Sequence, residues 1–125
     1  MIRVEGLRKA FQTRTGRVQA VDGVSFAAAD GQITGLLGPN GAGKTTTLRM
    51  LYTLMSPDSG RVLVDGLDAA SEPTRVRASL GVLPDARGIY KRLTARENIA
   101  YFGALQDLDG RVIAERTDRL VSALE

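Results

Sequence analysis

The stretch Gly38-Pro39-Asn40-Gly41-Ala42-Gly43-Lys44-Thr45 decides the fold of this chain. It matches the pattern Gly-x-x-x-x-Gly-Lys-Thr, and the apolar run 33–37 before it predicts a buried strand. Apolar residues recur at helical spacing after it and predict that a helix follows. These residues are Leu48, Leu51, Tyr52 and Met55. A strand, a glycine loop and a helix in this order indicate a phosphate-binding loop, and a glycine-rich turn before an ordinary helix is the alternative.

The chemistry of this phosphate loop (residues 38–45) follows from its residue types. Glycines let several backbone N–H groups face one centre, because no Cβ atoms crowd it, and the helix beginning near Gly43 adds its dipole. Lys44 can reach the β- and γ-phosphates, the Thr45 hydroxyl can ligate Mg²⁺, and Thr46 can contact the α-phosphate. The residues expected to bind a nucleotide are Gly38, Pro39, Asn40, Gly41, Ala42, Gly43, Lys44, Thr45 and Thr46.

The composition is that of a soluble globular protein. The 125 residues are 43% hydrophobic and 25% charged, which suits one domain with a modest core. Without cysteine, no disulfide or thiolate metal site can form. No run is apolar enough to cross a bilayer and no signal peptide is evident, so we expect a cytoplasmic protein. The net charge of +3 is too small to indicate nucleic acid as a partner.

The rest of the chain predicts a mixture of strands and helices. Short strands are expected over 2–4, 18–26 and 62–64, with a polar, turn-rich segment over 8–16 and a further buried strand over 81–83. Helices are expected over 72–80, 94–105 and 109–125. Thr94 and Glu97 have the spacing of a capping box. The last helix is expected to turn Val112, Ile113, Leu120, Val121 and Leu124 toward the core. No linker is evident, so we expect no domain boundary inside the chain.

Several segments outside the phosphate loop belong to one pattern. They are Phe11, Val18-Gln19-Ala20-Val21-Asp22-Gly23-Val24-Ser25-Phe26, Asp30-Gly31, Pro57-Asp58-Ser59-Gly60, Val64-Asp65-Gly66 and Leu93-Thr94-Ala95-Arg96-Glu97-Asn98-Ile99. Together with residues 35–46 they closely resemble the nucleotide-binding subunit of ATP-binding cassette (ABC) transporters, from Ile2 to at least Leu105. The resemblance implies an α/β fold of the P-loop NTPase type (ABC ATPase): an antiparallel β subdomain, a P-loop core and the start of the helical subdomain.

The resemblance also implies a place for the nucleotide's base. Phe11 stands at the position of the aromatic residue that stacks on adenine, and Val18 would lie against the same base. Stacking of a base on a flat aromatic ring is worth about 1–3 kcal/mol whichever edge the base presents. A buried core role is the alternative for both side chains.

One position departs from the family pattern. The strand ending at Pro84 commonly delivers a glutamine that contacts Mg²⁺ and the attacking water, and this chain has Asp85 there. A carboxylate is a hard ligand suited to Mg²⁺, so Asp85 joins Lys44 as a catalytic candidate and Thr45 as a metal ligand. A solvated turn residue is the alternative. The run 84–94 is similar to the sodium-extruding branch of ABC exporters, which implies export.

Partners also follow from the resemblance. Residues 87–92 mix basic and apolar side chains, and in the resembled family this region faces the transmembrane permease subunit. An ordinary solvated loop is the alternative. The resemblance further implies a second nucleotide-binding domain, closing head to tail, and a peripheral position on the inner face of the cell membrane.

The family's Leu-Ser-Gly-Gly-Gln signature, its strand ending in Asp-Glu and its switch histidine do not occur in these residues. We therefore expect residues 1–125 to be a partial nucleotide-binding domain that exposes an unpaired strand edge, folds poorly alone, binds ATP weakly and does not turn it over. The complete protein is expected to be an ABC-type ATPase coupled to export of Na⁺ or a drug. An ABC ATPase acting on ribosomes or DNA, or a nucleotide-binding fragment without catalysis, are the alternatives.

Overall fold

The computed structural model describes residues 1–83 and 88–124, and their contacts fall into two compact units. The first unit is Met1–Val82 and the second is Leu83–Glu125. The sequence predicted no division inside the chain, whereas the contacts between residues separate it into these two units. The strands and first two helices share one core, whereas the last two helices pack on each other.

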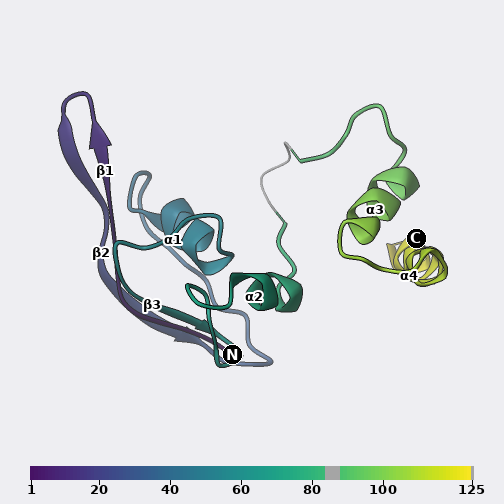
Figure 1. Cartoon of the computed structure of the whole chain (residues 1–125), viewed down its shortest axis with the longest axis horizontal. Helices are drawn as coiled ribbons and strands as arrows, with labels where there is room; N and C mark the ends of the chain where they lie inside the picture. The colour runs from purple at the N-terminus through teal and green to yellow at the C-terminus, as the bar shows by residue number, and fades with distance from the viewer. Residues whose placement is uncertain (84–87, 125) are drawn as a thin grey trace. The chain divides into compact units, whose positions relative to one another are not determined.

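The first unit is built on one antiparallel sheet with strand order β2-β1-β3-β4 (Figure 1). Its strands are β1 (Ile2–Thr13), β2 (Gly16–Ala28), β3 (Ser59–Val64) and β4 (Leu67–Asp68). β1 runs well past the expected residues 2–4, through the polar segment expected to be a turn. Pairing with β2 satisfies its backbone groups there, so a largely polar strand outside the core is stable.

The core of this unit lies between the sheet and two helices, α1 (Lys44–Leu51) and α2 (Pro73–Ser79). Val62 and Val64 alternate along β3 with an exposed or half-buried neighbour, and Val62 lies opposite Val4 of β1. The strand expected over 62–64 and the helix expected over 72–80 are confirmed. The buried apolar residues are Val4, Leu7, Val21, Met50, Leu51, Val62, Val64 and Val76.

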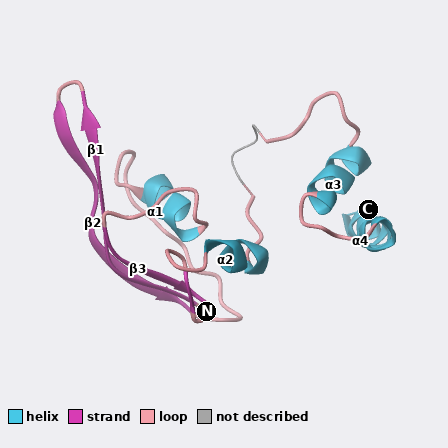
Figure 2. Cartoon of the chain, in the orientation of Figure 1, coloured by secondary structure: helices cyan, strands magenta, loops and turns pink. Residues whose placement is uncertain are grey.

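Two segments expected to be buried strands are loops instead, with exposed apolar side chains. Leu37 is 92% exposed and Leu83 is 99% exposed. Figure 2 draws the segment between β2 and α1 as loop, and no strand lies within residues 29–58. A parallel strand needs neighbours on its edges. The sheet seen in the described residues is wholly antiparallel and offers neither segment such a neighbour.

The second unit contains α3 (Ala95–Ala104) and α4 (Gly110–Leu124). The capping box is confirmed: the Thr94 hydroxyl accepts from the Glu97 N–H at 3.2 Å, and the Glu97 carboxylate accepts from the Thr94 N–H at 2.7 Å. The two helices approach closely where Ile113 packs against Gly103.

The apolar face expected of the last helix is only partly covered. Thr117 is the buried residue of α4, and its hydroxyl donates to the Ile113 carbonyl, whereas Leu120 and Leu124 are exposed. Ile113 packs against Gly103, and Asp118 pairs with Arg96 of α3 at 2.6 Å. Val112, Ile113 and Val121 are half-buried, so the exposed apolar residues of the expected face are Leu120 and Leu124.

The capping box predicts how acid affects the second unit. Hydrogen bonds from the Thr94 N–H and then the Thr94 hydroxyl hold the pKa of Glu97 below its ordinary value. A carboxyl whose pKa is lower in the folded state contributes stability that is fully present above its unfolded pKa, about 4.3, and is lost as pH falls through the folded value.

The variant Glu97→Gln tests this. In urea unfolding at a series of pH values, the stability difference between wild type and Glu97→Gln should be constant above about pH 5 and shrink below it. The control is Glu115→Gln, because that carboxylate pairs with Arg119 of its own helix at 3.2 Å and caps nothing. A difference for Glu97→Gln that does not change with pH would contradict the capping account.

Candidate functional site

The phosphate loop leads into α1 through glycines with left-handed backbones. Gly41 has φ 83° and Gly43 has φ 85°, values that residues with a Cβ rarely adopt. The Ala42 N–H donates to the Pro39 carbonyl at 3.2 Å and closes a turn within the loop. The glycine loop and the start of the helix are therefore present where the sequence predicts them, but the helix ends at Leu51, before the expected Tyr52 and Met55.

Gly43 also fixes the loop against the sheet. A Cβ built on this residue would lie 2.1 Å from the backbone oxygen of Ala20 in β2 and 3.1 Å from a methyl group of Val21. Only glycine fits so close to another backbone without a shift. The contact places the start of α1 directly on β2.

The first turn of α1 has N–H groups without acceptors in the helix. Its first bond of the helical type runs from the Thr47 N–H to the Gly43 carbonyl at 2.8 Å, so the amides of residues 44–46 lack a carbonyl one turn earlier. Gly43 provides no side-chain cap, and no acidic residue stands in the first turn. No negative charge of the first turn therefore offsets the positive end of the helix dipole, and this end of the helix suits an anion.

The ammonium group of Lys44 lies over the start of the loop. Its Nζ donates to the carbonyls of Gly38 and Pro39, each at 2.7 Å. A lysine ammonium has three N–H donors, and these two bonds leave the third for an anion. The lysine is thus held beside the same amides that the glycines expose.

The metal-ligand candidates are only partly described. Thr45 is exposed on the first turn of α1 and Thr46 is half-buried, whereas Asp85 lies outside the described residues. Over residues 1–83 and 88–124, no three His, Cys, Asp or Glu side chains gather as a metal site. One hydroxyl fits a Mg²⁺ ion that takes its other ligands from phosphate oxygens and water, as Mg²⁺ commonly does.

Phe11 and Val18 are opposite each other in the β1–β2 hairpin. Phe11 is half-buried and Val18 is 50% exposed, and neither belongs to the buried core, so the core alternative is wrong for Val18 and unsupported for Phe11. An open recess of about 240 Å³ lies beside Phe11. Its other lining residues are Ala10, Gln12, Arg17 and Asp58.

The segment 57–60 carries part of the family resemblance, but the sequence analysis assigns Asp58 no role in the site. Its carboxylate accepts from Lys9 Nζ and from the Ala10 N–H, each at 2.8 Å. Lys9 Nζ in turn lies 5.9 Å from the centre of the Phe11 ring, within reach of a cation–π interaction. Asp58 and Lys9 are 49 positions apart, so no local pattern could reveal this contact.

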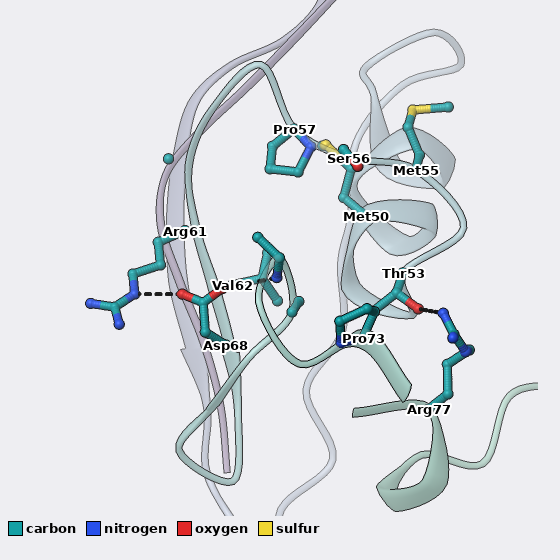
Figure 3. A pocket seen from close by; sticks show the side chains of 13 residues that line it. Met50, Thr53, Met55, Ser56, Pro57, Arg61, Val62, Asp68, Pro73 and Arg77 are labelled. Carbon is teal, nitrogen blue, oxygen red and sulfur yellow. Dashed lines mark hydrogen bonds and ion pairs between the residues drawn. The ribbon is translucent and has the colours of Figure 1, made fainter. Parts of the chain in front are cut away.

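A larger cavity, of about 320 Å³, lies at the opposite end of α1 from the phosphate loop (Figure 3). Met50, Val62 and other apolar residues line it, and most of its polar side chains are paired. Arg77 donates to the Thr53 hydroxyl at 2.8 Å, and Arg61 pairs with Asp68 at 2.9 Å. The phosphate loop, with its open amides and lysine, is the stronger candidate site.

Comparisons with known proteins agree with this geometry. A family model described as ABC transporter matches residues 21–125. The ABC transporter ATP-binding protein NatA of Bacillus subtilis is 41% identical over 121 residues, which are 96% of this chain and 49% of that protein. The daunorubicin resistance ATP-binding protein DrrA2 of Streptomyces coeruleorubidus is 42% identical over 117 residues, 94% of this chain and 36% of that protein.

A solved structure shows the same fold. The ATP-binding cassette MJ0796, in a dimeric post-hydrolysis state bound to ADP and Pi, superimposes with a TM-score of 0.80 at 22% identity, over 93% of this chain and 53% of that chain. The chain thus spans about half the length, or less, of the relatives it matches. In the described part of the chain, no helix is both long and apolar enough to cross a membrane.

The contact of Gly43 with β2 predicts a large effect of one methyl group. Gly43→Ala must displace the loop from the Ala20 carbonyl, whereas a Cβ at Gly41 meets nothing within 4 Å. Both residues have nearly the same φ, so Gly41→Ala is a matched control for the backbone strain. We expect Gly43→Ala to lower the free energy of unfolding by about 1–3 kcal/mol more than Gly41→Ala, measured by urea unfolding. Equal losses would show that the close contact does not constrain the loop.

Proposed function

The chain belongs to the ABC transporter family, and from this membership we propose that it is the nucleotide-binding part of an ATP-binding subunit that binds and, in the complete protein, hydrolyses ATP. Its fold is that of ABC ATPase cassettes. The observation that carries the proposal is the set of groups found at the start of α1. The amides of residues 44–46 have no acceptor one turn earlier, Gly41 and Gly43 have left-handed backbones, and the Lys44 ammonium is bonded to the carbonyls of the same loop.

The phosphates are bound by groups fixed before they arrive. The amides of residues 44–46 donate to phosphate oxygens, and the third N–H of Lys44 reaches the β- and γ-phosphates. Donors already oriented in this way need little reorganisation as charge develops on the transferring phosphoryl group. Residues 38–43 shape the cradle, because their glycines allow the backbone to approach the phosphates closely.

Magnesium enters this proposal with the nucleotide. The Thr45 hydroxyl supplies one ligand, and Asp85 remains a proposed second ligand and catalytic residue by resemblance. When bound, Mg²⁺ neutralises charge on the phosphate oxygens. The base is proposed to stack on Phe11, with Val18 beside it on the same face of the hairpin.

We extend the proposal to export through a transmembrane permease subunit. It is supported by the names of the relatives, NatA as an ABC transporter ATP-binding protein and DrrA2 as a daunorubicin resistance protein. The transporter and drug-resistance names favour export of a drug over action on ribosomes or DNA, and export of Na⁺ is proposed from the resemblance of residues 84–94 alone. The dimeric state of the MJ0796 cassette supports a second nucleotide-binding domain as partner. A peripheral position on the inner face of the cell membrane follows from a permease partner.

Replacing Lys44 tests the proposed nucleotide site. In the full-length protein, Lys44→Ala should weaken MgATP binding about 10- to 100-fold, the loss expected for charge-assisted hydrogen bonds, and should abolish steady hydrolysis. Titration calorimetry measures the first effect and phosphate release the second. The control is Arg49→Ala, which removes a cation from the last turn of the same helix. It should leave the MgATP affinity and the hydrolysis rate within about twofold of wild type. Binding that is indifferent to Lys44→Ala would overturn the proposal.

A further inference from the structure

We propose that the ion pair between Lys9 and Asp58 positions Phe11, so that this pair sets the affinity for the base of the nucleotide without touching its phosphates. The inference rests on the proposed function, because it concerns the base half of the same site. It adds two positioning residues, Lys9 and Asp58, whose contact the sequence analysis does not predict.

Asp58 is joined to three consecutive residues of β1. Its N–H donates to the Arg8 carbonyl at 2.9 Å, and its carboxylate accepts from Lys9 Nζ and the Ala10 N–H, each at 2.8 Å. These three hydrogen bonds fix the position and the orientation of the β1 backbone directly before Phe11. The register of β1 against β3 shifts between Glu5 and Arg8, and their last pair is Arg8 with Ser59, so beyond Arg8 the ladder with β3 does not hold β1.

Lys9 carries the constraint from Asp58 to the aromatic ring. Its side chain is only 18% exposed, and its ammonium lies 5.9 Å from the centre of the Phe11 ring. A cation held by a carboxylate on one side and a ring on the other has little rotational freedom. Lys9 therefore restrains the ring, and the open recess beside Phe11 is left for a flat group such as a base.

The carboxylate of the pair is stabilised in its ionised form. The hydrogen bond from Lys9, followed by that from the Ala10 N–H, holds the pKa of Asp58 below its ordinary value. Arg17 adds a second positive charge nearby and also lines the recess. Ionisation of Asp58 is thus favoured by every basic group that faces it from the hairpin.

Asp58 also connects the two halves of the proposed site. It lies in the segment that leaves the C-terminal end of α1, the helix whose first turn holds the phosphate loop. Its bonds tie that segment to β1 next to Phe11. The spacing between a phosphate group on α1 and a base on the hairpin therefore depends on this residue.

The test compares a ligand that has a base with one that has none. Affinities for MgATP and for magnesium tripolyphosphate are measured by titration calorimetry on the full-length protein. The reference variant, Phe11→Ala, should weaken MgATP binding about 5- to 150-fold and leave tripolyphosphate within about twofold. Asp58→Asn and Lys9→Met should lower the affinity for MgATP about 3- to 10-fold. Both variants should leave the affinity for tripolyphosphate within about twofold of wild type.

Asp68→Asn is the matched control. The Asp68 carboxylate likewise pairs with a cation, Arg61, and accepts from backbone N–H groups, those of Ala70 and Ser71, but it lies on β4 away from Phe11. The Asp68→Asn variant should leave the ratio of the MgATP affinity to the tripolyphosphate affinity unchanged. Lys9→Arg keeps the cation and should retain at least half of the wild-type ratio.

The outcomes separate the two proposals. Equal weakening of MgATP and tripolyphosphate by Asp58→Asn, or no effect on either, would overturn the positioning role while Lys44-dependent binding stands. MgATP binding that Lys44→Ala does not weaken would overturn the proposed function itself. A change of the MgATP to tripolyphosphate ratio in Asp58→Asn and Lys9→Met, absent from Asp68→Asn, supports the inference.

Discussion

The amides at the start of α1 have no acceptors within their own helix, and the arrangement of the first unit depends on this constraint. Polar groups left without partners destabilise a fold when they are buried. Here they remain open because the glycine loop keeps side chains away from them and Gly43 lies against the Ala20 backbone. The sheet thus holds the first turn of α1 in place while its donors face outward. An anion is the natural partner for such a turn.

The β1–β2 hairpin carries the second part of the proposed site, the residues proposed to hold the base. Phe11 and Val18 lie opposite each other near its end, where the strands are exposed and cannot be held by a core. Side-chain bonds replace the core there, and those of Asp58 are the ones that join the hairpin to the segment after α1. A site that must accept a ligand cannot be filled by its own side chains, so polar contacts around its edge are a reasonable way to hold it.

Local sequence signals predicted what local contacts decide. The phosphate loop, the helix after it and the capping box of Thr94 and Glu97 each depend on residues within one or two turns. The apolar run 33–37 predicts a buried strand but forms none. An apolar pattern shows that a strand can form, whereas pairing requires a neighbouring strand that the antiparallel sheet does not supply. Leu120 and Leu124 are exposed for a similar reason, since an apolar helical face predicts burial only where a partner covers it, and the second unit leaves these two side chains uncovered. The contact of Asp58 with Lys9 joins distant residues and has no signature in either segment.

Hydrogen exchange at single-residue resolution is the most direct test of the central claim, that the open amides of α1 bind phosphate. The amides of Lys44, Thr45 and Thr46 should exchange fast in the full-length protein alone and slow markedly when MgATP is added, because phosphate oxygens then accept their hydrogen bonds. Saturating MgATP that leaves the exchange of these three amides unchanged would contradict the account.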